Sequence, residues 1–93
     1  MVQDDVIKPV QIEHLVDEVW NDEDLEQYYN YLDYHFEEGN AYLRARVYLD
    51  DPGTALLFGP FDSRRSVKAV TAPNAREAVV AYLGRRFRKV VQR

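Results

Sequence analysis

The sequence predicts a small α+β domain in which two N-terminal helices precede a three-stranded antiparallel β-meander and a C-terminal helix. Apolar residues recur with a helical period before residue 38, alternate with period two from Ala41, and return to a helical period near the C-terminus. The 93 residues, 46% of them hydrophobic, suffice for one core and are too few for two domains. We therefore expect a single compact domain over residues 1–93, with the order α-α-β-β-β-α and residues 1–8 as a flexible arm.

The first helix is predicted over residues 9–20. Apolar residues follow the i, i+3, i+4, i+7 spacing of one helix face, at Ile12, Leu15, Val16 and Val19. Pro9 suits the first turn of a helix, where its missing N–H would have no partner in any case.

The second helix is predicted to begin after Asn21 and to end near Glu38. Asn21 can cap it, and the acids that follow would place negative charge on the positive end of the helix dipole. One face is apolar, at Leu25, Tyr28, Tyr29, Leu32 and Phe36. Gly39 and Asn40 then provide a left-handed stop. The alternative is one long helix through Asn21.

Three strands are predicted in the middle of the chain. Between residues 41 and 49 apolar residues alternate with basic and aromatic ones, which is typical of a half-buried strand. Residues 50–53 form a Pro-Gly turn, and residues 54–58 return as a second strand that ends at Gly59-Pro60. Residues 67–71 are the third strand.

The last helix is predicted over residues 75–91. Asn74 and Glu77 have the spacing of a capping box, and a broad apolar face follows, at Val79, Val80, Leu83, Phe87, Val90 and Val91. Gly84 lies within this helix, where it can permit close packing.

Charge is segregated along the chain. The first forty residues carry twelve Asp or Glu and one Lys, whereas residues 41–93 carry eleven Lys or Arg and four acids. The two parts therefore have charges of −11 and +7, which sum to the net −4. Such fields affect the choice of partner and the rate of association. The acidic and basic surfaces can also pair with each other within one molecule.

Two contact surfaces follow from these predictions. The acidic and aromatic surface, a candidate for binding a protein partner, comprises Tyr31, Tyr34, Asp33 and Glu37. The basic surface, a candidate for contacting anions or nucleic acid, comprises Arg44, Arg46, Arg64, Arg65, Arg85, Arg86, Arg88 and Lys89. We expect a non-enzymatic binding or adaptor domain that contacts a protein partner or self-associates as a homodimer. The alternative is an RNA- or DNA-binding domain.

The predicted order α-β-β-β-α between Asp22 and Val91 resembles that of double-stranded-RNA-binding domains. Those domains contact phosphates through a lysine cluster at the start of the last helix, where this chain has Pro73-Asn74-Ala75-Arg76-Glu77. The resemblance is therefore limited to topology.

Several chemistries are made improbable by composition. The chain has no Cys and two His, of which His14 with Glu18 has metal-ligand spacing but lacks a third ligand. No HExxH pattern and no glycine-rich phosphate loop occurs. The N-terminus lacks a signal-peptide pattern, and no apolar run approaches the roughly 18 residues of a membrane span. We expect a cytoplasmic protein without a metal, a cofactor or a membrane contact.

Overall fold

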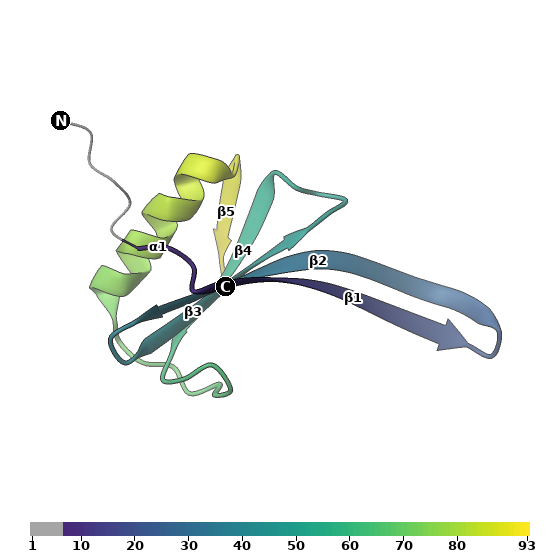
Figure 1. Ribbon diagram of the computed structural model, residues 1–93, viewed down its shortest axis with the longest axis horizontal. Helices are drawn as coiled ribbons and strands as arrows, with labels where there is room; N and C mark the ends of the chain where they lie inside the picture. Colours follow the sequence, from purple (N-terminus) through teal and green to yellow (C-terminus); the bar gives the residue numbers. More distant parts are fainter. Residues whose placement is uncertain (1–6) are drawn as a thin grey trace.

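The computed structural model describes residues 7–93, which form one five-stranded mixed sheet with one helix on one of its faces (Figure 1). The elements are β1 (Gln11–Asn21), β2 (Asp24–Glu38), β3 (Ala41–Tyr48), β4 (Thr54–Phe61), α1 (Pro73–Arg86) and β5 (Lys89–Gln92). The strands lie in the order β1-β2-β3-β4-β5. The first four are antiparallel neighbours, and β5 is parallel to β4. In residues 7–93 the structure contains no candidate for a membrane-spanning helix.

The two predicted N-terminal helices are wrong, because this part of the chain forms the long hairpin β1–β2. The apolar residues that suggest one helix face are divided between two faces of a strand. Ile12 and Val16 lie on one face, and Leu15 and Val19 lie on the other. Both strands are rich in β-branched and aromatic residues, which favour a pleated backbone over a helix.

The predicted helix boundaries are hairpin turns. Asn21 pairs with Asp24 across a two-residue turn in which Asp22 has φ 56°, a left-handed conformation that Asp tolerates. Glu38 pairs with Ala41 across Gly39 and Asn40, and Gly39 has φ 59°. The sequence therefore predicts element boundaries at both positions, although the two helices that it places before residue 39 are wrong.

The first predicted strand is confirmed as β3, and the second is confirmed but longer. Gly59-Pro60 does not end β4, which continues to Phe61. The third predicted strand, residues 67–71, is wrong: its only ladder contact among the described residues is the isolated bridge between Phe61 and Ala69. The strand that pairs with β3 on its other side is instead β2 of the N-terminal hairpin.

The C-terminal helix is confirmed but shorter than predicted. It ends at Arg86, after which Phe87 adopts an extended backbone and Val90 and Val91 belong to β5. The predicted capping box is also wrong, because Ala72 is the N-cap and no side chain caps the helix. The segment β4-α1-β5 is a parallel crossover, in which the long connection between the two strands is usually a helix.

The core lies between α1 and the face of the sheet that it covers, here called the inner face. Phe36 packs edge-on against Tyr82, and Tyr34 against Phe87, with ring centroids 5.4 and 5.7 Å apart. Fully buried side chains from several elements fill the space between the helix and the sheet, at Phe36, Leu43, Leu57, Val79 and Leu83. The opposite face, here called the outer face, carries polar and aromatic residues. The flexible arm predicted for residues 1–8 falls mainly outside the described residues, and Ile7 itself is buried in the core.

Substitution of two glycines tests this backbone. A Cβ on Gly59, which has φ 109°, would lie 2.8 Å from the carbonyl oxygen of Tyr42, whereas a Cβ on Gly84 would meet no atom within 4 Å. We expect Gly59→Ala to lower the free energy of unfolding by roughly 2 kcal/mol or more, because it combines backbone strain with a steric clash. Gly84→Ala should raise it by about 1 kcal/mol. Urea denaturation followed by circular dichroism measures both, and equal effects would contradict the backbone conformation described for Gly59.

Candidate functional site

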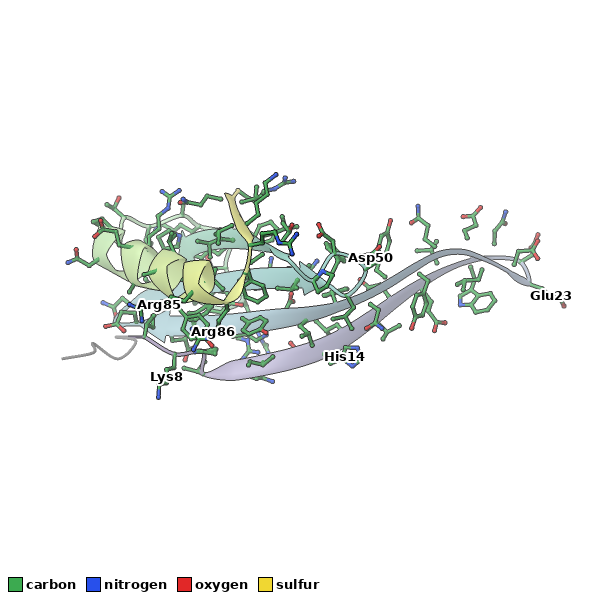
Figure 2. All side chains as sticks on the ribbon, turned by 90° about the horizontal axis from the view of Figure 1, so that it is seen from above. Lys8, His14, Glu23, Asp50, Arg85 and Arg86 are labelled. Carbon is green, nitrogen blue, oxygen red and sulfur yellow. The ribbon has the colours of Figure 1, made fainter. Side chains whose placement is uncertain are left out.

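The most unusual feature is a two-stranded projection, here called the arm, that comprises residues 16–30. Strand β3 pairs with β2 only from Tyr31 to Glu38, so that beyond Tyr31 the hairpin has no third strand. The arm extends away from the helix-covered part of the sheet and gives the molecule its length of 54 Å (Figures 1 and 2). Isolated two-stranded hairpins are marginally stable in water. A projecting hairpin of this length therefore needs an explanation beyond its own fold.

The arm exposes apolar side chains on both of its faces. Of ten exposed large hydrophobic residues in the described part of the chain, the arm contributes six: Val16, Val19, Trp20, Leu25, Tyr28 and Tyr29. Trp20 is 55% exposed and Tyr28 is 54% exposed. Trp20 and Leu25 are cross-strand partners and so share a face. Exposed apolar patches of this kind mark contact surfaces.

The arm is also strongly acidic. It carries Asp17, Glu18, Asp22, Glu23, Asp24 and Glu26 and no Lys or Arg, which gives it a charge of −6. The rest of the chain has twelve bases and ten acids and so a charge of +2. None of the ion pairs between described residues involves a carboxylate of the arm. Figure 2 shows Glu23 at the free end of the arm, far from Lys8, Arg85 and Arg86.

A hollow lies where the arm joins the sheet. Its volume is about 350 Å³, and it lies between the base of the arm and the turn after β3, lined by Tyr28, Tyr29, Asn30, Tyr48, Leu49 and Asp50. The backbone N–H of Leu49 donates to the carbonyl oxygen of Asn30 at 2.9 Å, which attaches this turn to the arm. Tyrosines around a recess provide rigid amphipathic contact surface, as at the anchor points of protein interfaces.

An ion pair on the outer face fixes the base of the arm. Arg46 donates two hydrogen bonds to the carboxylate of Asp33, at 2.9 and 3.1 Å, and joins β3 to β2. These bonds raise the pKa of Arg46, so that it stays charged. Its guanidinium also lies 4.2 Å from the ring centroid of Tyr31, whose hydroxyl donates to Asp17 of the arm at 2.8 Å. The pair therefore links three strands.

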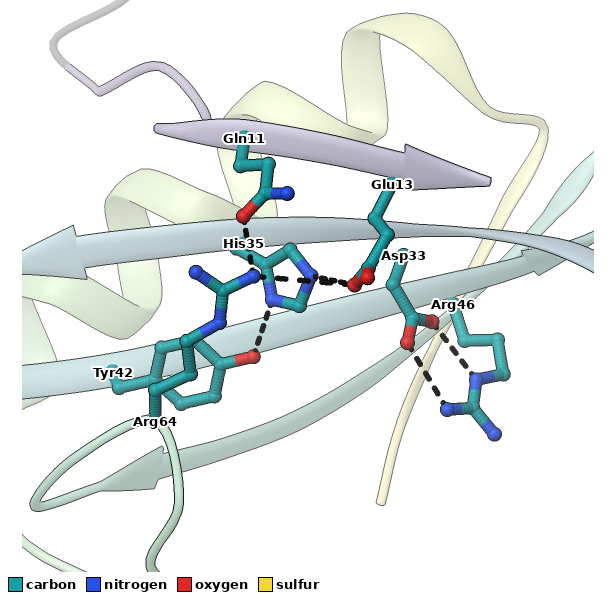
Figure 3. Close-up of polar contacts among 7 residues, drawn as sticks. All are labelled: Gln11, Glu13, Asp33, His35, Tyr42, Arg46 and Arg64. Carbon is teal, nitrogen blue, oxygen red and sulfur yellow. Dashed lines mark hydrogen bonds and ion pairs between the residues drawn. The ribbon is translucent and has the colours of Figure 1, made fainter. Parts of the chain in front are cut away.

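A second polar group lies beside it on the outer face (Figure 3). His35 of β2 contacts the hydroxyl of Tyr42 through Nδ1 at 2.6 Å and the carboxylate of Glu13 through Nε2 at 3.0 Å. Arg64, from the loop after β4, donates to the side-chain oxygen of Gln11 and lies 3.9 Å from Glu13. The group joins β1, β2, β3 and this loop.

The arrangement of Glu13, His35 and Tyr42 has the connectivity of an acid, a base and a hydroxyl, but it does not face a substrate. His35 is 4% exposed and Tyr42 is 2% exposed, and both nitrogens of the imidazole are engaged. A catalytic hydroxyl must be accessible to the atom that it attacks. These residues therefore act as a structural connection. In residues 7–93, no three His, Asp or Glu side chains converge as a metal site.

The predicted acidic and aromatic surface is not one surface. Tyr31 and Asp33 lie on the outer face and are 5% and 3% exposed. Tyr34 lies on the inner face, where it packs against Phe87, and only Glu37 is exposed. Tyr31 and Asp33 thus contribute to the base of the arm rather than to a contact surface.

The predicted basic residues are also divided. Arg46 and Arg64 make the outer-face contacts described above, and Arg44 lies 5.1 Å from the ring centroid of Phe58. Arg65 is exposed in the loop after β4. The others lie near the end of α1 and the start of β5: Arg85, Arg86, Arg88 and Lys89, with Arg86 stacked on Tyr82 at 3.7 Å. The structure therefore separates the strand arginines from the C-terminal cluster.

The residues that sequence reasoning misses are the apolar residues of the arm. The spacing of Leu25, Tyr28 and Tyr29 fits one helix face and so predicts a helical core for residues that are exposed, and Trp20 is exposed beside them. A usable signal is present in the composition: aromatic and β-branched residues interleaved with acids on both sides of a short polar turn. Comparison of the chain with known protein families, with curated proteins and with solved structures finds no match.

Removing the carboxylate of Asp33 should destabilise the fold. Asp33→Ala leaves Arg46 without its ion-pair partner, and we expect the free energy of unfolding to fall by about 2 to 4 kcal/mol. In the double variant Asp33→Ala/Arg46→Met the loss should be smaller than the sum of the single losses, because the uncompensated charge is gone. Glu37→Ala, at an exposed site on the same strand, should change stability by less than about 0.5 kcal/mol. Additive losses in urea denaturation would show that the pair does not act as a unit.

Stability should also fall at alkaline pH. Burial raises the pKa of Tyr31, Tyr34 and Tyr42 above the ordinary value of 10.0, and at Tyr31 the hydrogen bond to Asp17 adds to the effect. Above pH 10 the unfolded chain therefore loses these protons before the folded chain does, and folding becomes less favourable as pH rises. Urea denaturation between pH 8.5 and 11.5 measures the slope. Tyr31→Phe should flatten it, and an unchanged slope in that variant would contradict the assignment.

Proposed function

We propose that this protein is a protein-interaction module whose contact element is the arm. One observation carries the proposal: fifteen consecutive residues, supported by no third strand, hold six of the ten exposed large hydrophobic residues of the described chain together with six acids and no base. A surface of this composition gains free energy when a partner covers it.

The apolar surface that the arm exposes is large enough to provide the free energy of specific binding. A fully buried aromatic side chain removes about 150 to 250 Å² from water. At about 25 cal/mol per Å², the exposed halves of Trp20 and Tyr28 alone offer roughly 4 to 6 kcal/mol. The base of the arm is fixed by the Asp33–Arg46 pair, so part of the ordering cost is met before binding.

The composition of the arm also indicates which kind of surface its partner has. Six carboxylates without a neutralising base attract a partner with a basic surface, and this attraction increases the association rate. The apolar rows and the hollow at the base of the arm require apolar side chains beside those bases. A basic and apolar protein surface therefore complements the arm, which binds by contact and not by chemistry.

Nucleic-acid binding through the basic residues stays a prediction with less support. Arg46 and Arg64 are engaged by side chains of the sheet, and an arm of charge −6 would repel a phosphate backbone. Arg88 and Lys89 remain its best candidate residues, and a gel shift with short RNA and DNA at low salt would test it.

Site-specific photo-crosslinking in cells that make the protein tests the proposed function. We expect p-benzoylphenylalanine in place of Tyr28 to give a covalent adduct of defined mass, either with another protein or with a second copy. In place of Val67, which is 90% exposed but lies outside the arm, it should give none. The adduct at position 28 should disappear in the variant Trp20→Ser/Leu25→Ser. Equal crosslinking at both positions, or none at position 28, would refute an arm-based contact.

A further inference from the structure

Strand β1 is a long free edge of the sheet. It is the first strand in the order β1-β2-β3-β4-β5, pairs only with β2, and has eleven residues, whereas β5 at the other edge has four. One side of such a strand presents backbone N–H and C=O groups that no strand within the described chain pairs, which makes it a template for another strand. The side chain of Arg64 reaches Gln11 on the outer face, and among the described residues no backbone hydrogen bond joins a segment other than β2 to this strand.

The side chains of β1 on the inner face form a nearly symmetric row about Val16. Apolar residues stand at Ile12, Val16 and Trp20, with His14 and Glu18 between them. All are exposed. Trp20 donates its indole N–H to Glu18 at 3.0 Å, and His14 contacts the side-chain oxygen of Asn30, so the two polar side chains are oriented within the row.

This row is complementary to itself when read backwards. In an antiparallel pair of β1 strands with Val16 opposite Val16, Ile12 of one copy lies opposite Trp20 of the other, and His14 lies opposite Glu18. Apolar and base–acid pairs directly across two strands are stabilising. On the outer face the same register places Glu13 opposite Val19 and Leu15 opposite Asp17, without like charges opposite each other.

The neighbouring registers lack this match. A shift that places Asp17 on the two-fold axis sets Asp17 opposite Asp17, and one that places Leu15 there sets Asp17 opposite Glu13. Like charges directly opposite each other are destabilising. The register about Val16 also directs the two acidic tips away from each other. Asn21 of each copy then lies opposite Gln11 of the other, and Asp24 is level with Asn21 on β2, so that the acidic tip of one arm lies beside the body of the second copy, which carries a charge of +2.

We propose that the partner of the arm is a second copy of this chain, paired antiparallel through β1 about a two-fold axis at Val16. The inference rests on the proposed function and names its partner. The two sheets join into one continuous sheet with both helices on the same side, and the inner-face row of one arm continues into that of the other. Because the contact is isologous, it closes at two chains.

Disulfide crosslinking tests the register. The chain has no Cys, so any disulfide reports an introduced thiol. Val16→Cys should give a covalent dimer under mild oxidation at low micromolar concentration. Ile12→Cys and Trp20→Cys should each give little dimer alone and a heterodimer when mixed. Leu49→Cys, exposed in the turn after β3, is the control and should stay monomeric. Equal crosslinking of Val16→Cys and Leu49→Cys would overturn the proposed pairing.

Sedimentation of the unmodified chain and of charge variants gives the second readout. His14→Glu places a carboxylate opposite that of Glu18 and should weaken the dimer at least tenfold, whereas His14→Glu/Glu18→Lys should restore it. A chain that sediments as a monomer at tens of micromolar would end this inference. If position 28 still crosslinks to a different protein, the interaction module stands with another partner; if it crosslinks to nothing, both proposals fail.

Discussion

The ion pair between Asp33 and Arg46 is the constraint on which the rest of the structure depends. It lies two residues from the last pair of β2 and β3, Tyr31 and Tyr48, and it holds the ring of Tyr31 against the guanidinium. Tyr31 in turn binds Asp17 through its hydroxyl, so the direction in which the hairpin leaves the sheet is set by side chains of three strands. A two-stranded extension without such an attachment would gain little from its own pairing.

The two faces of the sheet are stabilised by different interactions. The inner face forms the core with α1, where Phe36, Leu57 and Val79 are completely buried or nearly so. The outer face is stabilised by polar contacts, with His35 as the shared member between Tyr42 and Glu13. Because both faces are engaged within the body of the protein, the apolar surface left for a partner is concentrated on the arm, and the functional proposal follows from that distribution.

The break at Gly39, strand β3, the turn after it and most of α1 can be predicted from the sequence, because each depends on local chemistry, such as the glycine at the break and the strict alternation from Ala41 to Val47. The hairpin turn at Asp22 is misread as the start of a helix. The hairpin β1–β2 is misread as helices because its apolar residues occupy both faces, which removes the alternation and leaves spacings of three and four. Strand β5 is misread as part of the last helix, because Val90 and Val91 have the spacing of its apolar face. In the structure this helix ends at Arg86. The contact surface cannot be predicted from the spacing of apolar residues, because residues that contact a partner need not have the spacing of residues that pack in the core.

The acidity of the arm has a further meaning for the behaviour of the protein in solution. A long, apolar edge strand is the kind of element from which fibrillar aggregates grow. Glu13, Asp17 and Glu18 interrupt that strand with negative charge, and the acids around the turn repel the tips of other molecules. The carboxylates thus act as gatekeepers, which allow one register of strand addition and oppose open-ended stacking while they remain ionised.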